Sequence, residues 1–104
     1  MNDAYIVAAV RTAGARKGGR LAAWHPADLA PEVLNPLLER TAADPRVIDD
    51  VIMGCVSQVG EQANNIARNA VLASRLPESV PGTSVDRQCG SSQQALHFAA
   101  QAVM

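Results

Sequence analysis

The sequence has few aromatic residues and no excess of charge of either sign. It contains one Trp, one Tyr and one Phe in 104 residues, so a core would be built mainly from Ala, Val, Leu and Ile, which contribute to a hydrophobic content of 48%. The formal net charge of -1 argues against nucleic acid or an anionic membrane as the main partner. A chain of this length is sufficient for one small domain.

Cysteines and long apolar runs are also scarce. Two cysteines, Cys55 and Cys89, make neither a disulfide framework nor a zinc site. No run approaches the roughly 18 apolar residues that span a bilayer. The apolar stretch from Ala4 to Val10 is short, follows Asp3 and lacks the basic segment of a signal peptide. We therefore expect no metal, no membrane span and a reducing cytoplasm as the location.

Cys89 lies where a short predicted strand meets a predicted helix. The strand, Thr83 to Val85, is rich in β-branched residues, whereas residues 93–104 contain no Gly or Pro and are rich in helix formers. Cys89 is thus expected in the elbow or first helical turn, where backbone N–H groups lack intrahelical partners and the helix dipole favours a thiolate. The same N–H groups can bind an oxyanion when the sulfur attacks a carbonyl carbon.

The helix after Cys89 is apolar around most of its circumference, which predicts burial inside something large. Its polar residues Gln93, His97 and Gln101 form one stripe at four-residue spacing. His97 is not expected to act as the base for Cys89 in the same molecule, because it lies roughly 12 Å further along the helix axis. The alternative for Cys89 is the usual role of a free cysteine, a small buried hydrophobic residue.

In the residues before the strand that leads to Cys89, the hydrophobic pattern predicts two more strands and two main helices. The strands are Tyr5–Val10 and Val51–Val56, both buried on both faces. One helix covers Asp28–Ala42 with Asp28 as N-cap, and Pro36 predicts either a kink or a helix shorter than this pattern suggests. A turn or single helical turn starts at Asp44-Pro45. The next helix runs from Asn64 or Asn65 through Ser74, with Ile66, Ala67, Ala70, Val71 and Ala73 facing inward. The order βα(α)βαβα predicts a layered α/β fold.

For other residues that could take part in binding or catalysis, an ordinary structural or surface role is also open. The loop from Arg11 to Trp24 carries Arg11, Arg16, Lys17 and Arg20 beside two glycines, which suggests either a phosphate site or a solvated surface, although it matches no phosphate-binding fingerprint. We interpret His25 as a loop residue and Cys55 as a structural residue in mid-strand. Arg68 is interpreted as a brace for the polar loop Ser57–Ala63, a subunit contact or a plain surface residue.

The residues around Cys89 resemble the nucleophilic-cysteine signature of thiolases, the acetyl-CoA C-acyltransferases. The matching segment is Val85-Asp86-Arg87-Gln88-Cys89-Gly90-Ser91-Ser92-Gln93-Gln94-Ala95, and further similar segments are Ile6 to Thr12, Gly18 to Leu21, Val51 to Val56 and Gly60 to Arg68. The likeness keeps the family's order from about Tyr5 to Met104. Ser92-Gln93 replaces the more usual Gly-Leu and is closer to the bacterial degradative branch that acts on longer or polycyclic acyl chains.

The resemblance implies a thiolase-like fold that is incomplete, with residues 1–104 forming the first part of the nucleophile-bearing N-terminal domain. It implies an acyl transfer in which Cys89 attacks a 3-oxoacyl-CoA, holds the acyl group as a thioester and passes it to coenzyme A. The backbone N–H of Cys89 would contribute to an oxyanion hole. The resemblance further implies coenzyme A and acyl-CoA as substrates, no permanently bound cofactor, no metal and a homo-oligomer, either dimer or tetramer.

In thiolases the activating histidine, a second acid/base cysteine and the main coenzyme A loop come from later residues. We therefore expect the 104-residue chain to be a truncated product or fragment that is inactive alone. Two alternatives remain. One is a ketosynthase-like condensing enzyme, which also has a cysteine at a helix start. The other is a noncatalytic module that persists by pairing exposed strand edges with another chain.

Overall fold

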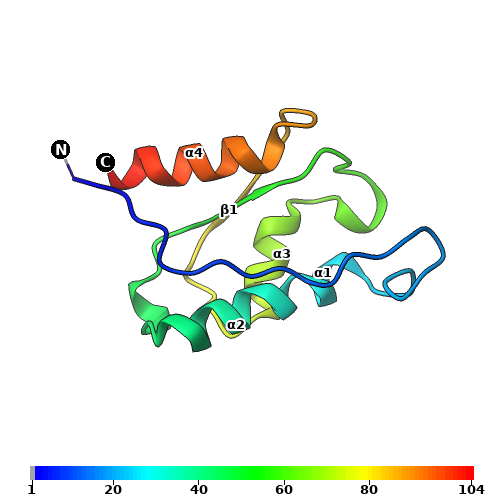
Figure 1. Cartoon of the computed structure of the whole chain (residues 1–104), viewed down its shortest axis with the longest axis horizontal. Coiled ribbons are helices and arrows are strands. Elements are labelled where there is room, and N and C mark those ends of the chain that lie inside the picture. The colour runs from blue at the N-terminus through cyan, green and yellow to red at the C-terminus, as the bar shows by residue number, and fades with distance from the viewer. Residues whose placement is uncertain (1) are drawn as a thin grey trace.

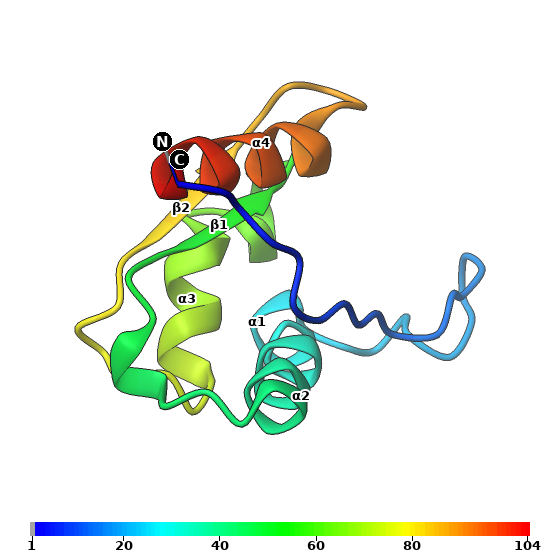
Figure 2. The same cartoon turned by 60° about the vertical axis from the view of Figure 1, so that its left-hand side comes forward.

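Two short parallel strands lie between helices in the computed structural model, which describes residues 2–104. Strands β1 (Val51–Gly54) and β2 (Gly82–Val85) pair with Val51 opposite Gly82 and Gly54 opposite Val85. Helix α4 (Ser91–Val103) covers one face of the pair, and α3 (Ile66–Ala73) covers the other (Figure 2). The predicted layered α/β class is confirmed, together with both of these strands and both helices.

Each of the two covering helices approaches the sheet at a glycine. A Cβ atom on Gly54 would lie 2.5 Å from the carbonyl carbon of Ser91, and one on Gly82 would lie 2.6 Å from the backbone nitrogen of Arg68. Real Cβ atoms do not approach backbone this closely, so both positions need glycine for close approach. The layers α4, sheet and α3 therefore depend on Gly54 and Gly82.

The hydrophobic core lies on the α3 side of the sheet. The side chain of Val71 is fully buried, and the small residues Ala67 and Ala70 let α3 lie close to β2. The remaining buried members of the core are Val51, Leu76 and Val80, and Leu34, Leu38, Ile48 and Met53 pack against them. Ala73, expected to face inward, is exposed, because α3 ends there. Val56 is also exposed, since β1 ends at Gly54 and is shorter than predicted.

Two helices replace the single one expected over Asp28–Ala42. Helix α1 (Pro26–Leu29) begins two residues before Asp28, because the Nδ1 atom of His25 accepts a hydrogen bond from the N–H of Ala27 at 3.1 Å and caps it. The break falls before Pro31, which opens α2 (Pro31–Thr41), where a missing N–H does no harm. Pro36 lies inside α2, and α2 is shorter than the Asp28–Ala42 pattern, which was one of the two expected consequences of this proline.

The N-terminal segment contradicts the prediction of a buried strand over Tyr5–Val10. Residues 2–16 form neither helix nor strand, and Tyr5, Ile6 and Val7 are 78%, 75% and 81% exposed. A strand must pair its backbone N–H and C=O groups, and this segment joins neither β1 nor β2. It begins beside the C-terminal end of α4 and then runs along the molecule towards α1 (Figure 1). The segment therefore does not form a strand, and its apolar side chains at residues 5–7 stay exposed.

Short turns complete the chain. The 3-10 helices η1 (Pro45–Val47) and η2 (Gly60–Gln62) precede β1 and α3, and η1 confirms the single turn predicted at Asp44-Pro45. Asp44 caps η1, and its hydrogen bonds from Arg46 hold the pKa of the Asp44 carboxyl below its ordinary value. Asn65 caps α3 as expected. Within residues 2–104, no helix combines the length and the apolar character that crossing a bilayer requires.

Arg68 braces the turn that leads into β2. One nitrogen of its guanidinium, Nη1, donates to the carbonyl oxygens of Glu78 and Val80, at 2.6 Å in both cases. Hydrogen bonds to a charged group are worth more than neutral ones. Arg68 therefore braces a turn, as one alternative expected, but the turn follows α3 and is not the Ser57–Ala63 loop that precedes it.

We predict that Gly54→Ala lowers the free energy of unfolding by about 1–3 kcal/mol, because α4 must move away from β1 to admit the methyl group. Gly14→Ala is the matched control, since a Cβ there meets nothing within 4 Å. Chemical denaturation of both variants measures the effect. Equal stabilities for the two variants would contradict the close contact of α4 with β1.

We also predict that Arg68→Met costs about 1.5–3 kcal/mol of unfolding free energy, because two carbonyl oxygens lose a charged donor. Arg40→Met is the control: Arg40 is exposed on α2 and its side chain donates no hydrogen bond within residues 2–104. The same denaturation experiment applies. A cost for Arg68→Met no larger than that for Arg40→Met would show that the brace contributes nothing.

Candidate active site

Cys89 lies in the elbow between β2 and α4. It directly precedes Gly90, the N-cap residue of α4, and its side chain is exposed. The predicted sequence of strand, cysteine and helix is therefore present, and α4 starts at Ser91, so Cys89 lies in the elbow and not in the first helical turn. Within residues 2–104, Leu96 and Phe98 of α4 are 53% and 43% exposed, so the burial of this helix inside something larger stays a prediction.

The elbow is closed by backbone hydrogen bonds across the cysteine. The N–H of Gly90 donates to the carbonyl of Arg87 at 2.9 Å, and the N–H of Ser91 donates to the carbonyl of Gln88 at 3.1 Å. Gln88 has a positive φ of 44°, which is unfavourable for any residue with a Cβ atom. The side chain of Asp86 accepts from the Gln88 N–H at 2.9 Å and helps to hold this conformation.

Two side-chain contacts reinforce the same turn. The buried hydroxyl of Ser91 donates to the Gln88 carbonyl at 2.6 Å and accepts from the Arg87 N–H at 2.8 Å. The guanidinium of Arg87 donates to the side-chain oxygen of Gln94 on α4. Sequence reasoning did not single out these residues for the site. The available signal was that serine is favoured at helix starts, where its hydroxyl can bond to nearby backbone.

Unpaired donors surround the cysteine. Gln94 is the first residue of α4 whose N–H bonds back to a carbonyl four residues earlier, that of Gly90, at 2.9 Å. Within residues 2–104, the N–H groups of Cys89, Ser92 and Gln93 donate to no protein acceptor. They lie at the positive end of the α4 dipole, which favours negative charge. This elbow can therefore stabilise a thiolate or an oxyanion.

The other candidate residues do not join Cys89. His97 is exposed further along α4, and His25 caps α1. Cys55 follows β1 instead of lying in mid-strand, and its N–H donates to the Val85 carbonyl at 2.9 Å, which is a structural role. No group of three or more metal-binding side chains gathers in the part of the chain that the structure describes.

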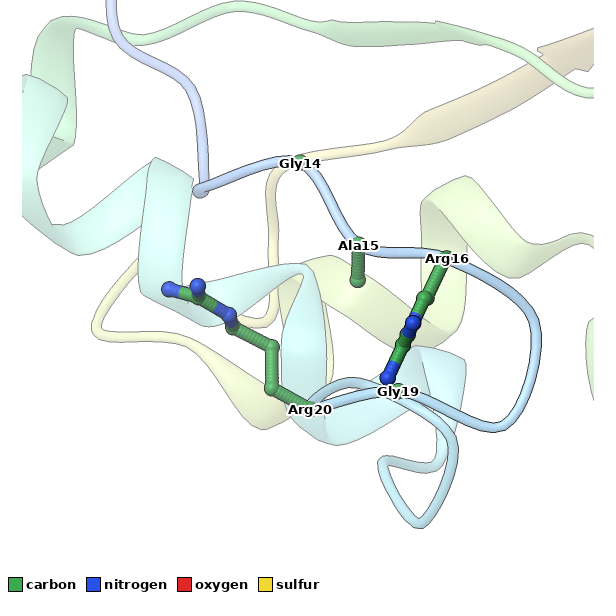
Figure 3. A pocket seen from close by; sticks show the side chains of 5 residues that line it. All are labelled: Gly14, Ala15, Arg16, Gly19 and Arg20. Atoms are coloured by element: carbon green, nitrogen blue, oxygen red, sulfur yellow. The ribbon is translucent and has the colours of Figure 1, made fainter.

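The basic loop forms an open hollow of about 560 Å³, lined by Gly14, Ala15, Arg16, Gly19 and Arg20 (Figure 3). The turn is closed by the N–H of Gly19, which donates to the Arg16 carbonyl at 2.8 Å. The loop's cations, Arg11, Arg16, Lys17 and Arg20, are all exposed. Of the two interpretations drawn from the sequence, these exposures match a solvated surface.

The fold and the elbow together define a layered α/β domain that presents a cysteine at the start of a helix. Residues 4–104 match the family described as the thiolase N-terminal domain. The chain therefore belongs to the thiolase family. This result confirms the resemblance drawn from the sequence and favours it over a ketosynthase-like enzyme.

Relatives and a solved structure agree with this assignment. Over its whole length the chain is 57% identical to the steroid 3-ketoacyl-CoA thiolase FadA6 of Mycobacterium tuberculosis, and this match covers 26% of that protein. Over its whole length it is also 48% identical to a 3-ketoacyl-CoA thiolase of Erwinia tasmaniensis, of which the match covers 27%. The crystal structure of the Bacillus anthracis acetyl-CoA acetyltransferase matches 80% of this chain and 21% of its own, with a TM-score of 0.73 and 40% identity. The chain spans about a quarter of the length of the curated relatives it matches.

The positive φ of Gln88 leads to a stability prediction. The Gln88 side chain is exposed, so substitutions there act mainly through the backbone. We expect Gln88→Val to lower the unfolding free energy by about 1–2 kcal/mol, because a β-branched residue tolerates positive φ poorly. Gln88→Gly should cost less, because glycine adopts this conformation without a steric penalty.

Thermal or chemical denaturation measures both variants. Gln93→Val, at an exposed helical position, is the control and is expected to cost about 0.5 kcal/mol or less. If Gln88→Val and Gln88→Gly had the same stability, the strained conformation of the elbow would be refuted.

Proposed function

We propose that this chain is the nucleophile-bearing part of an acyltransferase that cleaves 3-oxoacyl-CoA, with Cys89 as the nucleophile. The observation that carries the proposal is the exposed thiol of Cys89 at the start of α4, beside backbone N–H groups that have no acceptor within residues 2–104. Membership of the thiolase family supports the reaction class.

The reaction has two transfers. First, the Cys89 thiolate attacks the keto carbon of the substrate, a carbon–sulfur bond forms, and the adjacent carbon–carbon bond breaks. The leaving fragment takes a proton and departs as acetyl-CoA, while the acyl group stays on Cys89 as a thioester. Then the sulfur of free coenzyme A attacks the thioester carbon and Cys89 leaves as a thiolate. A thiolate suits both roles because it is a good nucleophile and a good leaving group.

Each transfer passes through a tetrahedral intermediate with a negatively charged oxygen. The N–H of Cys89 is available to donate to such an oxygen, since it has no acceptor within residues 2–104. Removing one donor of this kind typically lowers a rate about 10²- to 10³-fold. We assign the Cys89 N–H to one oxyanion hole.

We propose that the acyl chain of the substrate is long or polycyclic and that the reaction runs in the degradative direction. The 57% identity to a protein named a steroid 3-ketoacyl-CoA thiolase supports this choice. Ser92-Gln93, immediately after the elbow, is the sequence feature in agreement with it. Catalysis is proposed to use protein groups and the substrate thiol, without a metal or resident cofactor.

Assembly and location are further proposals. We propose a homo-oligomer in a reducing cytoplasm. Association is supported by apolar side chains that the described fold leaves exposed: Tyr5, Ile6 and Val7 in the N-terminal segment and Leu96, Phe98 and Val103 on α4. The N-terminal segment begins beside the C-terminal end of α4 (Figure 2).

A chimera tests the proposed function. This chain replaces the matching N-terminal residues of the steroid 3-ketoacyl-CoA thiolase, to which it is 57% identical over its whole length. We predict that the chimera cleaves a 3-oxoacyl-CoA in the presence of coenzyme A, and that Cys89→Ala lowers kcat at least about 10³-fold, because no acyl thioester can form. Cys55→Ala is the matched control and should retain activity. A Cys89→Ala chimera with full activity would refute the assignment.

The 104-residue chain alone is predicted to show no turnover of acetoacetyl-CoA. A catalytic thiol needs a positioned base, and His25 and His97 are engaged elsewhere or distant along α4. Absorbance of the substrate's enolate measures cleavage. Coenzyme A-dependent cleavage by the purified chain would contradict this prediction.

A further inference from the structure

The hydroxyl of Ser91 is buried directly beside the elbow. Ser91 is 4% exposed and is the one buried polar residue in the part of the chain that the structure describes. Its Oγ atom donates to the Gln88 carbonyl at 2.6 Å and accepts from the Arg87 N–H at 2.8 Å. Both bonds reach back over Cys89, so the cysteine is the middle residue of the turn that they close.

These bonds fix the plane of the peptide unit between Gln88 and Cys89. The Gln88 carbonyl is held from the α4 side by the Ser91 hydroxyl and also by the Ser91 N–H at 3.1 Å. The described chain contains no cis peptide bond. In a planar trans peptide the C=O and the N–H of the same unit point in opposite directions. Holding the Gln88 oxygen towards α4 therefore turns the Cys89 N–H away from α4.

The direction of this N–H matters because it has no acceptor within residues 2–104. A donor aimed away from its own helix can bind an oxygen atom outside the chain. The positive φ of Gln88 means that the turn does not hold this orientation without help. The hydroxyl of Ser91 supplies the shortest hydrogen bond to the Gln88 oxygen.

We propose that Ser91 is a positioning residue that orients the Cys89 N–H towards the carbonyl oxygen of the acyl substrate. This inference rests on the proposed function, in which Cys89 is acylated. Ser91 itself touches no substrate in this account; it acts through the peptide plane.

The prediction separates two reactions of the same thiol. 4-Nitrophenyl acetate acetylates a thiolate: the sulfur bonds to the carbonyl carbon through an oxyanion intermediate, and 4-nitrophenolate leaves with the electrons of the broken carbon–oxygen bond. Iodoacetamide alkylates a thiolate: the sulfur bonds to a saturated carbon, and iodide leaves without any oxyanion. Only the first reaction should depend on the direction of the Cys89 N–H.

The experiment compares both rates at Cys89 in the 104-residue chain, with the modified peptides identified by mass spectrometry. Ser91→Ala is expected to lower the acetylation rate at least about tenfold, because the oxyanion loses a directed donor. Alkylation should change less than about threefold, because it needs only the thiolate. Ser79→Ala, which removes an exposed hydroxyl outside the elbow, should change neither rate.

An isosteric pair separates the hydroxyl from packing. Ser91→Thr keeps the hydroxyl, whereas Ser91→Val introduces a side chain with the shape of threonine but without the hydroxyl. Acetylation should therefore be faster in the Thr variant than in the Val variant, while their alkylation rates agree. Circular dichroism shows whether each variant is folded.

The outcomes are distinct. Equal losses in acetylation and alkylation, or no loss in either, would overturn the role of Ser91 while leaving an acetylated Cys89 in place. Unfolding of both Ser91→Ala and Ser91→Val would assign the hydroxyl a structural role and would also overturn it. A wild-type chain that is acetylated at Cys55 but not at Cys89 would overturn the proposed function and this inference with it.

Discussion

The close approach of α4 to β1 is the constraint on which the elbow depends. Gly54 has no side chain, so the first turn of α4 lies directly against the strand. This contact fixes where the helix begins, and therefore where the chain must turn after β2. The turn is short enough to force Gln88 into positive φ and to leave Cys89 exposed next to Gly90. The chemistry proposed for the thiol is thus a consequence of packing two and three residues further on, at Ser91 and Ser92.

Much of the central fold could be predicted from local patterns. The β-branched run before Cys89, the apolar run at Val51 and the alanine-rich stretch after the elbow each became the expected element. Tyr5–Val10 did not, because an apolar run only says that burial is favourable, whereas a strand also needs a partner for its backbone. The separate short helix before Pro31 was not predicted either, because it depends on the cap that the side chain of His25 provides.

The site was predictable in part for the same reason. The position of Cys89 follows from the junction of two recognisable elements, and the family signature lies on that junction. The roles of Ser91 and Arg87 were not predictable, because they depend on the dihedral angles of a turn. The serine hydroxyl reaches both Arg87 and Gln88 only after Gln88 has adopted positive φ, and no periodicity in the sequence encodes that angle.

The central claim is that the start of α4 makes Cys89 an activated thiol, and its alkylation rate tests this most directly. In the 104-residue chain at pH 7, iodoacetamide should modify Cys89 at least about fivefold faster than it modifies the thiol of glutathione, because the helix start favours the thiolate. It should also modify Cys89 before Cys55. A rate at Cys89 equal to that of glutathione, or prior modification of Cys55, would contradict the account.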